Sequence, residues 1–376
     1  MPPERKVKVK VCAPRPRPKN VQPQRPIETI EDLLTCKSYG DRVRAFMDRA
    51  CSKTKKSTPF LTVFHCPEFS MKEIRNMSPS VRNKKPKGNE MDILDSKCIL
   101  VPETNSVWYD KDGVKLMQYF PHLLMSQVRF LCPFTDYKRN PNRVKDLESV
   151  VTTLVAHHPP HPPGSQESRH ASFKKWKAAL SENTPCGVIR LTIHAQQGHP
   201  VPVWSPSVSA HLLGGTTGRA AASLMYRGSP VVEDLSEQLS IILAAMDPDM
   251  WQVYRQAYVA MSNLFPVRNI DPRPGIQCFI GHYLLINMPT TIHFDKGDPP
   301  DGWAAMVVLG RFTGNPNLCV PEIRVALPYN AGDVVFLRSW ALKHYIRMFQ
   351  GPRYVIVFST SQQIFDWVKV VCSMPS

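Results

Sequence analysis

The sequence predicts a mixed α+β protein whose C-terminal third is an antiparallel β sandwich or barrel. Apolar residues recur at helical spacing in 232–246 and again after Pro248, whereas short β-rich runs separated by Gly, Pro and Asn follow Pro274. Regularly spaced short strands with such turns are typical of antiparallel sheets that stack or close.

The individual elements follow from local signals along the chain. Helical periodicity predicts helices over 28–36, 41–50 and 232–246, and Asp247 with Pro248 supplies an N-cap and first residue for a helix ending near 265. Alternation and β-branched residues predict upstream strands at 58–65 and 187–194, and C-terminal strands at 276–286, 303–312, 323–327, 333–339, 344–350 and 353–360.

Composition favours a nucleic-acid partner. Lys and Arg number 47 against 31 acidic residues, for a net charge of +16, and such a surplus attracts polyanions through counterion release. The alternative is surface charge that serves only solubility. No apolar run reaches membrane-spanning length, so no membrane association is expected. The ten scattered cysteines indicate reduced intracellular thiols rather than a disulfide framework or a zinc site.

The chain divides into three predicted units: a disordered, basic, Pro-rich arm over 1–26, an N-terminal α/β region with basic loops over 27–165, and a unit over 166–376 that contains the β-rich part. The arm holds eight basic residues against the single acid Glu4, and its prolines disfavour helix and strand. The motif HHPPHPPG at 157–164 is interpreted as a flexible loop, because its prolines prevent one face from presenting three histidine ligands.

Two candidate metal ligands occur in the segment PTTIHFDKGDPPDGW. His293 and Asp295 are one residue apart, so on an extended segment both side chains point to the same face. His344 opens a later β run and completes a set of two histidines and one carboxylate. Such a triad leaves sites open on ferrous iron for a chelating co-substrate and dioxygen. The alternative is a surface ion pair between His293 and Asp295, with His344 an ordinary core histidine.

Arg353 follows a predicted hairpin turn at 350–351. If Phe349 pairs with Pro352 across this turn, His344 and Arg353 share one face of the hairpin. A guanidinium there could hold the distal carboxylate of a dicarboxylate co-substrate through two hydrogen bonds. A register slip of one residue would turn Arg353 to the opposite face.

Five segments carry a family resemblance. HFDKGDPPDGWAAMVVLGRF, PYNAGDVVFLRSWALKHYI and GPRYVIVFST, with the upstream GVIRLTIHAQ and HLLGGTTGRAAA, resemble the fungal branch of the TET/JBP family. Members of this family are Fe(II)- and 2-oxoglutarate-dependent dioxygenases that act on methylated nucleobases. The resemblance spans residues 185–365, and 1–150 match no family that we recognise.

The resemblance implies a double-stranded β-helix, or jelly-roll, core with flanking helices, and makes 166–376 a dioxygenase catalytic domain. His293, Asp295 and His344 would hold Fe(II), Arg353 would anchor 2-oxoglutarate, and dioxygen would be the second co-substrate. The expected reaction oxidises the methyl group of 5-methylcytosine, of N6-methyladenine, or of both, in DNA.

One departure from the family pattern concerns the co-substrate pocket. Many relatives carry Ser or Thr two residues after the arginine, where this chain has Val355, so the carboxylate needs another partner; the candidates are Tyr283, Asn287 and Ser359. Asp298 is a candidate for a contact with the base or for tuning the cofactor pocket, and a turn-capping role in the loop GDPPDG is the alternative. Trp303 is a candidate for the base pocket, although an aromatic residue that begins a strand is more often part of the core.

A methylated base in a duplex must be flipped out or presented on a single strand, which requires basic groups for the phosphates. Besides the arm, the candidates are Lys84, Lys85, Lys87, Arg139, Arg143 and Lys145; each is also compatible with an ordinary solvated surface. Two other functions remain open: a protein or small-molecule hydroxylase on the same fold, and a non-catalytic nucleic-acid-binding protein derived from it. A monomer in the nucleus is expected.

Overall fold

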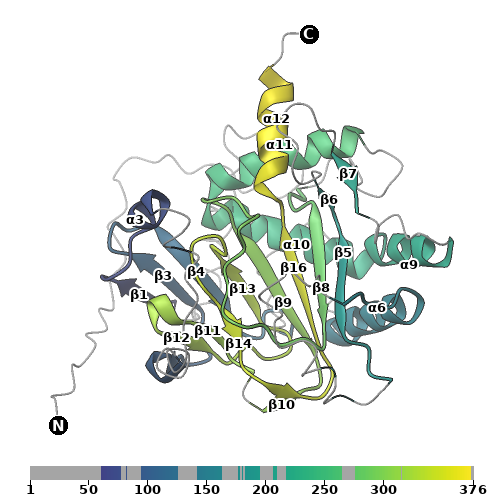
Figure 1. Cartoon of the computed structure of the whole chain (residues 1–376), viewed down its shortest axis with the longest axis horizontal. Coiled ribbons are helices and arrows are strands. Elements are labelled where there is room, and N and C mark those ends of the chain that lie inside the picture. Colours follow the sequence, from purple (N-terminus) through teal and green to yellow (C-terminus); the bar gives the residue numbers. More distant parts are fainter. Residues whose placement is uncertain are drawn as a thin grey trace, which may run out of the picture.

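An eight-stranded sheet is the largest element of the fold (Figure 1). The structure is a computed structural model that describes residues 61–77, 82, 95–125, 142–162, 177, 180, 183–194, 206–209, 217–264, 276–314 and 316–373. The strands of this sheet are β1 Thr62–Cys66, β3 Ser106–Asp110, β4 Lys115–Phe120, β5 Gly187–Leu191, β8 Gly281–Ile286, β9 Ala304–Gly310, β13 Val334–Leu337 and β16 Arg353–Ser359. Their order across the sheet is β1-β3-β4-β13-β9-β16-β8-β5.

Strand β9 lies near the middle of this sheet, between β13 and β16, and pairs antiparallel with both. Its sequence AAMVVLG has no polar residue to alternate with the apolar ones, and every position is buried. A short apolar run of this kind is typical of a strand that is covered on both faces. The large sheet is therefore the middle layer of the fold.

A four-stranded sheet faces one side of the large sheet. Its strands are β2 Ile99–Leu100, β11 Leu318–Val320, β12 Val325–Leu327 and β14 Tyr345–Ile346, in the order β14-β11-β12-β2. One apolar cluster contains side chains of both sheets, including Val308, Val335 and Val355 from the large sheet and Leu318 and Ile346 from the small one. From β9 onward the chain alternates between the sheets: β11 and β12 are in the small sheet, β13 in the large, β14 in the small and β16 in the large.

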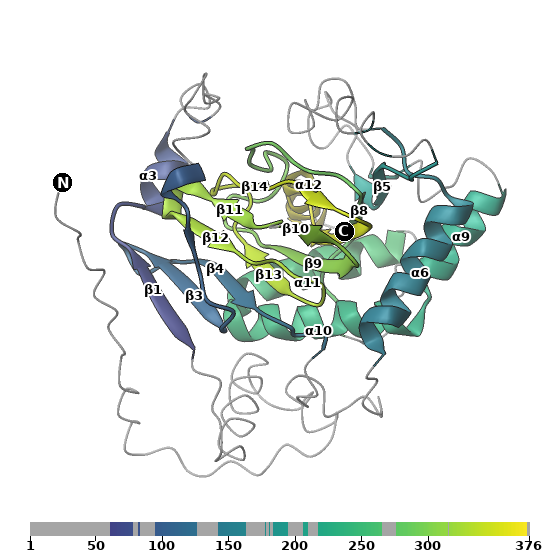
Figure 2. The same ribbon diagram turned by 90° about the horizontal axis from the view of Figure 1, so that it is seen from below.

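Helices cover the opposite side of the large sheet. They are α6 Arg143–His157, α9 Thr217–Arg227, α10 Pro230–Met246, α11 Pro248–Leu264 and α12 Gln362–Ser373. Figure 2 shows α10 and α11 on one side of the large sheet, and β11, β12 and β14 on the other. A second apolar cluster joins Leu147, Leu239 and Phe365 from the helices to Val307 and Ile356 from the sheet. Both faces of β9 and β16 are thus packed against apolar side chains.

Smaller elements complete the described residues. They are helix α3 Met71–Asn76, the single 3-10 turn η2 Pro321–Ile323, a ladder of β6 Ile193–His194 with β7 Ser207–Val208, and a ladder of β10 Thr313–Gly314 with β15 Phe349–Gln350.

The predicted helix boundary at Asp247 is confirmed. A carboxylate oxygen of Asp247 accepts a hydrogen bond from the backbone N–H of Met250 at 3.2 Å, and Pro248 is the first residue of α11. An Asp side chain in this position satisfies one of the backbone donors that the first turn of a helix leaves without a partner. The strands predicted at 187–194, 276–286, 303–312 and 353–360 also correspond to described strands, with shifted ends.

The predicted hairpin around 350–351 is wrong. Strand β16 pairs with β9 and β8 in the large sheet, whereas β14 belongs to the small sheet and β15 pairs with β10. The residues on either side of Gly351 therefore belong to different sheets rather than to one two-stranded ribbon. Arg353 and His344 nevertheless both lie on the side between the sheets. Arg353 shares a face of β16 with Val355, His344 shares a face with Ile346, and both apolar residues pack between the sheets.

The interpretation of HHPPHPPG as a flexible solvated loop is wrong for its first part. His158 is 1% exposed, and its Nδ1 lies 3.1 Å from the Ser223 hydroxyl on α9. His161 exchanges backbone hydrogen bonds with Val188 of β5, at 2.8 and 3.0 Å. These contacts fasten the end of α6 to the edge of the large sheet.

Several predictions lie outside the described residues. They are the basic arm over 1–26, the helices over 28–36 and 41–50, the start of the strand at 58–65, and the loop that contains Lys84, Lys85 and Lys87. Strand β4 pairs with β13, so segments from both sides of residue 166 share one sheet. The division at that residue stays a prediction. Among the described helices, none is both long and apolar enough to cross a membrane.

Candidate metal centre

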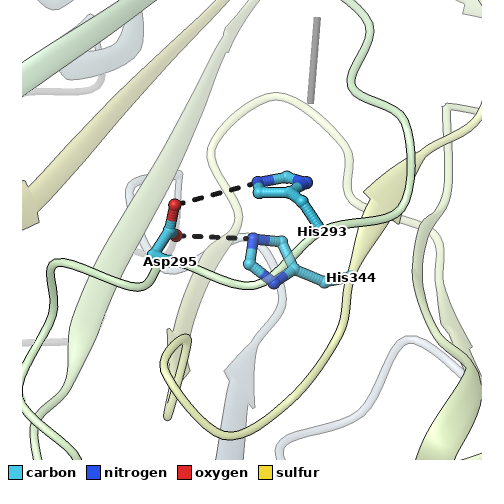
Figure 3. A group of neighbouring side chains, drawn as sticks. All are labelled: His293, Asp295 and His344. Atoms are coloured by element: carbon cyan, nitrogen blue, oxygen red, sulfur yellow. Dashed lines mark ion pairs between the residues drawn. The ribbon is translucent and has the colours of Figure 1, made fainter. Parts of the chain in front are cut away.

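The three predicted ligands lie together where two extended segments meet. His293 and His344 form an antiparallel bridge, with each backbone N–H donating to the other's carbonyl at 3.1 and 2.8 Å. His344 directly precedes β14, and its side chain shares a face with Ile346, which packs between the two sheets. Asp295 follows two residues after His293, and the three side chains converge, as Figure 3 shows.

Backbone contacts fix the orientation of both imidazole rings. Nδ1 of His293 lies 2.7 Å from the carbonyl oxygen of Thr291, and Nδ1 of His344 lies 3.1 Å from that of Leu342. A carbonyl can only accept, so each Nδ1 carries the hydrogen and each Nε2 keeps its lone pair. This is the arrangement in which a metal-binding histidine is usually held.

The two Nε2 atoms face the carboxylate of Asp295. Nε2 of His293 lies 3.9 Å from one carboxylate oxygen, and Nε2 of His344 lies 3.7 Å from the other (Figure 3). These separations are longer than hydrogen bonds. Ligand atoms of all three residues lie within 4.8 Å of one another. Two neutral imidazoles and one carboxylate fit a divalent first-row metal ion with its remaining positions open.

A second pair of contacts holds the loop that carries Asp295. The backbone N–H of Asp295 donates to the carbonyl of Ser339 at 2.9 Å, and the Ser339 hydroxyl donates to the Asp298 carboxylate at 2.5 Å. The backbone N–H of Asp298 also donates to the carbonyl of Asp295 at 3.1 Å. These bonds favour the turn-capping alternative for Asp298, which positions the ligand loop on the end of β13.

Arg353 is buried on the same side of the large sheet as the candidate metal ligands. It is 2% exposed, and its guanidinium carbon lies 5.1 Å from the ring centre of Tyr329, 5.2 Å from that of Phe349 and 5.5 Å from that of Phe312. Among the described residues, its Nε and Nη2 have no hydrogen-bond partner. Burial lowers the pKa of Arg353 to about 10, so the group remains charged at neutral pH. A buried cation without a carboxylate favours an anionic ligand.

Two residues at neighbouring strand ends set the position of Arg353. The Asn287 side chain accepts from the backbone N–H of Arg353 at 2.8 Å and donates to the carbonyl of Pro185 at 2.8 Å. Asn287 has a φ of 50°, a conformation that Asn tolerates better than most residues. Gly310 pairs with Arg353 at a φ of 112°. The contacts of Asn287 make it a support for the arginine rather than a direct ligand of a carboxylate.

The other predicted co-substrate contacts differ in their distance from Arg353. Ser359 is at the opposite end of β16, six residues away, or roughly 20 Å along an extended strand. It is therefore too far to bind the same carboxylate as Arg353, and this prediction is wrong. Tyr283, on the neighbouring strand β8, pairs with Val357 of β16. It therefore lies closer to Arg353 than Ser359 does, and it stays a candidate.

Tyr329 was not predicted from the sequence, yet it is a buried hydroxyl beside Arg353. It is 1% exposed, and among the described residues its hydroxyl has no hydrogen-bond partner. Burial raises the pKa of Tyr329, so the hydroxyl remains a donor at neutral pH. Its φ is 56°, just before a turn in which the Asp333 carboxylate accepts from the backbone N–H of Asn330 at 2.7 Å. Only tertiary contacts bring Tyr329 to Arg353, so no local signal could have identified it.

The base-pocket prediction for Trp303 does not fit its surroundings. Trp303 is 0% exposed and packs in the helix-side cluster, where its indole N–H donates to Asp247 at 2.9 Å. Two other aromatic residues lie closer to the ligands in sequence: Phe294 between two of them, and Trp340 beside Ser339. The Arg82 guanidinium carbon lies 4.5 Å from the ring centre of Phe294 and 3.6 Å from that of Trp340.

The candidate phosphate contacts have different outcomes. Arg143 is an ion-pair partner of Asp234, with 2.7 Å between Nη2 and Oδ2, and its side chain is 13% exposed, so it is engaged inside the protein. Lys145 is exposed on α6 and stays a candidate. Arg139 and the three lysines at 84, 85 and 87 lie outside the described residues.

Comparison with known protein families finds no match, and no curated protein matches the chain. Among solved structures, the chain is similar to NgTET1 in complex with 5mC DNA, at 12% identity and a TM-score of 0.46, covering 86% of this chain and 91% of that one. It is also similar to a 2OG-Fe(II) oxygenase family oxidoreductase from Burkholderia pseudomallei, at 12% identity and a TM-score of 0.27, covering 51% and 81%. A third is OsALKBH1, at 11% identity and a TM-score of 0.29, covering 65% and 96%. These similarities are distant.

Proposed function

We propose that this protein is an Fe(II)- and 2-oxoglutarate-dependent oxygenase that oxidises methylated bases in DNA. The observation that carries the proposal is the convergence of His293, Asp295 and His344, with both Nε2 atoms directed at the carboxylate. A buried, charged Arg353 on the same side of the large sheet adds an anion site. The alternation of strands between two facing sheets supports a double-stranded β-helix as the core.

His293, Asp295 and His344 would hold the metal ion. Ferrous iron with 2-oxoglutarate and dioxygen supplies the oxidising power needed to hydroxylate a methyl group. The protein's part is to position the groups and to exclude competing reactions. The backbone carbonyls of Thr291 and Leu342 keep both Nε2 lone pairs available, and the Ser339–Asp298 bond holds the carboxylate loop.

Arg353 and Tyr329 would bind the distal carboxylate of 2-oxoglutarate. The guanidinium offers two donors in a planar fork that matches a carboxylate. Tyr329 would supply the hydroxyl that Val355 lacks. Its hydroxyl, which has no hydrogen-bond partner among the described residues, would donate to the carboxylate that Arg353 binds. The rings of Phe312 and Phe349 keep water away from the guanidinium, which strengthens the attraction between the two charges.

Three features support a methylated base in DNA as the substrate. The net charge of +16 favours a polyanion. Phe294 and Trp340 place two aromatic rings near the ligand loop, with the Arg82 guanidinium over both; aromatic rings and a cation are the groups that bind an unstacked base and its phosphate. The family resemblance of the sequence implies the same substrate class. Nuclear residence belongs to the proposal because chromosomal DNA is the expected substrate.

The proposal is tested by incubating the protein with Fe(II), 2-oxoglutarate and oligonucleotides that contain 5-methylcytosine, N6-methyladenine or neither. Nucleoside mass spectrometry then measures loss of each modified base. Wild type should consume at least one of them, His344→Ala should not, and His65→Ala should match wild type because His65 is an exposed residue of β1.

The same experiment separates the two alternatives. If neither modified base is consumed and His344→Ala behaves as wild type does, the enzyme proposal fails. Succinate that forms only when a protein or small molecule is added would favour a hydroxylase with a different substrate. DNA binding that is identical with and without metal, together with no succinate at all, would favour the non-catalytic alternative.

A further inference from the structure

Two cysteine thiols meet on the outer face of the small sheet. Cys319 lies in β11 with its neighbours Leu318 and Val320 directed at the core between the sheets, so its own side chain points outward. The residues just before β2 cover this face. There the backbone N–H of Cys98 donates to the carbonyl of Asp95 at 3.1 Å, which closes a short turn over the sheet.

Polar contacts hold this turn on the sheet. Nε of Arg347 donates to an Asp95 carboxylate oxygen at 2.9 Å, and the Tyr345 hydroxyl donates to the same oxygen. The two bonds hold the turn against β14 and against the segment that follows it. Because Asp95 is fixed by these two bonds, the turn places Cys98 over Cys319, with the small side chain of Ala326 beside them.

The two thiols interact directly. A hydrogen bond with the Cys98 thiol lowers the pKa of Cys319, with further lowering from the Tyr345 hydroxyl and the positive charge of Arg347, against the opposing effects of burial and of the Asp95 carboxylate. The same hydrogen bond, burial and Asp95 raise the pKa of Cys98. A thiolate is the reactive form of cysteine, and a nearby cation favours it. Neither cysteine is in a disulfide. The pair therefore has two sulfur atoms packed together, and Cys319 is the thiol that is favoured as the thiolate.

The other described cysteines have different partners. The thiol of Cys186 donates to the carbonyl of Asn287 at 3.2 Å, and that of Cys278 donates to the Ser240 hydroxyl at 3.3 Å. Cys66 is half-buried in β1, at the far edge of the large sheet. Within the described ranges, 98 and 319 are the one pair of cysteines whose thiols contact each other. Cys98 is only partly buried, so solvent reaches one side of the pair.

We propose that Cys98 and Cys319 form a dithiol site that hydrogen peroxide converts reversibly to a disulfide. One thiolate attacks peroxide, which breaks the O–O bond and gives a sulfenic acid and water. The second thiol then attacks that sulfur and loses its proton, which forms the S–S bond and releases the oxygen as a second water. Overall, two thiols lose two electrons and two protons to one peroxide, and a dithiol reductant reverses the step.

The position of the site gives the modification a structural consequence. Cys319 pairs across the sheet with Tyr345, the residue that follows the candidate ligand His344. A disulfide would link the covering turn covalently to the strand beside the candidate metal centre. The inference itself depends only on the two thiols and not on the proposed enzymatic function.

The test uses the full-length protein, reduced and then treated with increasing hydrogen peroxide in the presence of a metal chelator. Remaining thiols are blocked by alkylation, and non-reducing peptide mapping by mass spectrometry identifies the linked residues. The expected result is a peptide that joins Cys98 to Cys319 at the lowest effective dose, with two thiols lost per chain and both recovered by dithiothreitol. Cys66→Ser should form the same link at the same rate.

Cys98→Ser and Cys319→Ser are the matched variants, and circular dichroism establishes that each is folded. Neither should form the link, and each should lose its first thiol at least about tenfold more slowly than wild type. The inference is overturned if other cysteines link first, if wild-type Cys98 passes to sulfinic acid without a link, or if both folded variants lose thiols at the wild-type rate. The chelator keeps this outcome separate from any test of the oxygenase.

Discussion

At the scale of single residues, the proposed binding of metal and co-substrate depends on how each side chain is held. The two histidines direct Nε2 at Asp295 because backbone carbonyls occupy both Nδ1 atoms. Arg353 is buried against three aromatic rings, and Asn287 accepts from its backbone N–H. The histidine Nε2 atoms therefore face Asp295, and Nε and Nη2 of Arg353 have no hydrogen-bond partner among the described residues.

Arg353→Lys should weaken 2-oxoglutarate binding with little effect on metal binding. Lysine keeps the positive charge but cannot form the planar two-bond contact, and one hydrogen bond to a charged group contributes about 1.5–3 kcal/mol. The expected loss is therefore about 10- to 150-fold in affinity, measured by calorimetry on protein loaded with Mn(II). Arg311→Lys is the control, because Arg311 is exposed beside the same strand end. Equal affinity in both variants would contradict the role of Arg353.

The burial of His158 leads us to expect that the stability of the protein depends on pH. Burial lowers the pKa of His158 to about 4, and the charges of His161 and Arg219 act in the same direction. In the unfolded chain this imidazole takes up a proton near pH 6.5, whereas in the folded chain it does so only near pH 4. Protonation therefore favours the unfolded chain, and the folded protein loses stability as the pH falls from about 6.5 to about 4.

His158→Gln should therefore reduce the difference in unfolding free energy between pH 7 and pH 5 by on the order of 1 kcal/mol. Urea denaturation at the two pH values measures this difference. His65→Gln, at an exposed position of β1, should leave the difference at the wild-type value. If the two variants show the same pH dependence, His158 is not the group responsible.

At the scale of elements, the close approach of strands fixes the candidate co-substrate pocket. A Cβ atom at Gly310 would lie 2.3 Å from the carbonyl oxygen of Pro352, and the φ of Gly310 is 112°. This backbone contact allows β9 to pair with β16 up to Arg353. Only glycine combines that conformation with that approach.

Gly310→Ala should destabilise the protein by about 2–4 kcal/mol, because both the backbone conformation and the contact are incompatible with a side chain. Gly218→Ala, at a position in α9 with no atom within 4 Å of the added Cβ, should change stability by less than about 1 kcal/mol. Chemical denaturation measures both. A Gly310→Ala protein as stable as wild type would show that β9 and β16 do not approach as described.

Local sequence signals predicted much of the fold and the three residues that the structure brings together as candidate metal ligands. The cap at Asp247 and the short apolar runs predicted α11, β9 and β16, and the one-residue spacing of His293 and Asp295 placed both on one face. The partners of β16 could not be predicted, because the choice between a hairpin and a crossing to the other sheet depends on contacts distant in sequence. Tyr329 was missed, and Ser359 was wrongly included, for the same reason.

At the scale of the whole molecule, the net charge of +16 is the feature that the described residues explain least. The segment 1–26, which lies outside them, holds eight basic residues and one acidic residue, and so contributes nearly half of the surplus. If the protein binds DNA through phosphate contacts, affinity must fall as salt displaces those contacts.

For the full chain binding duplex DNA, a plot of log affinity against log salt concentration should have a slope of about −3 or steeper, since each phosphate contact contributes about −0.9. A chain that lacks 1–26 should show a shallower slope. Fluorescence anisotropy over a range of salt concentrations measures both. A full-length slope near zero would contradict nucleic acid as the partner.

The most direct test of the candidate metal centre is metal binding by the reduced protein under anaerobic conditions. Calorimetric titration with Mn(II) in the presence of 2-oxoglutarate should show one ion bound per chain. The affinity should fall at least about 100-fold in Asp295→Ala and in His344→Ala, each of which removes a protein ligand, while His65→Ala should bind as wild type does. If both ligand variants bind Mn(II) with wild-type affinity and stoichiometry, His293, Asp295 and His344 do not form a metal site.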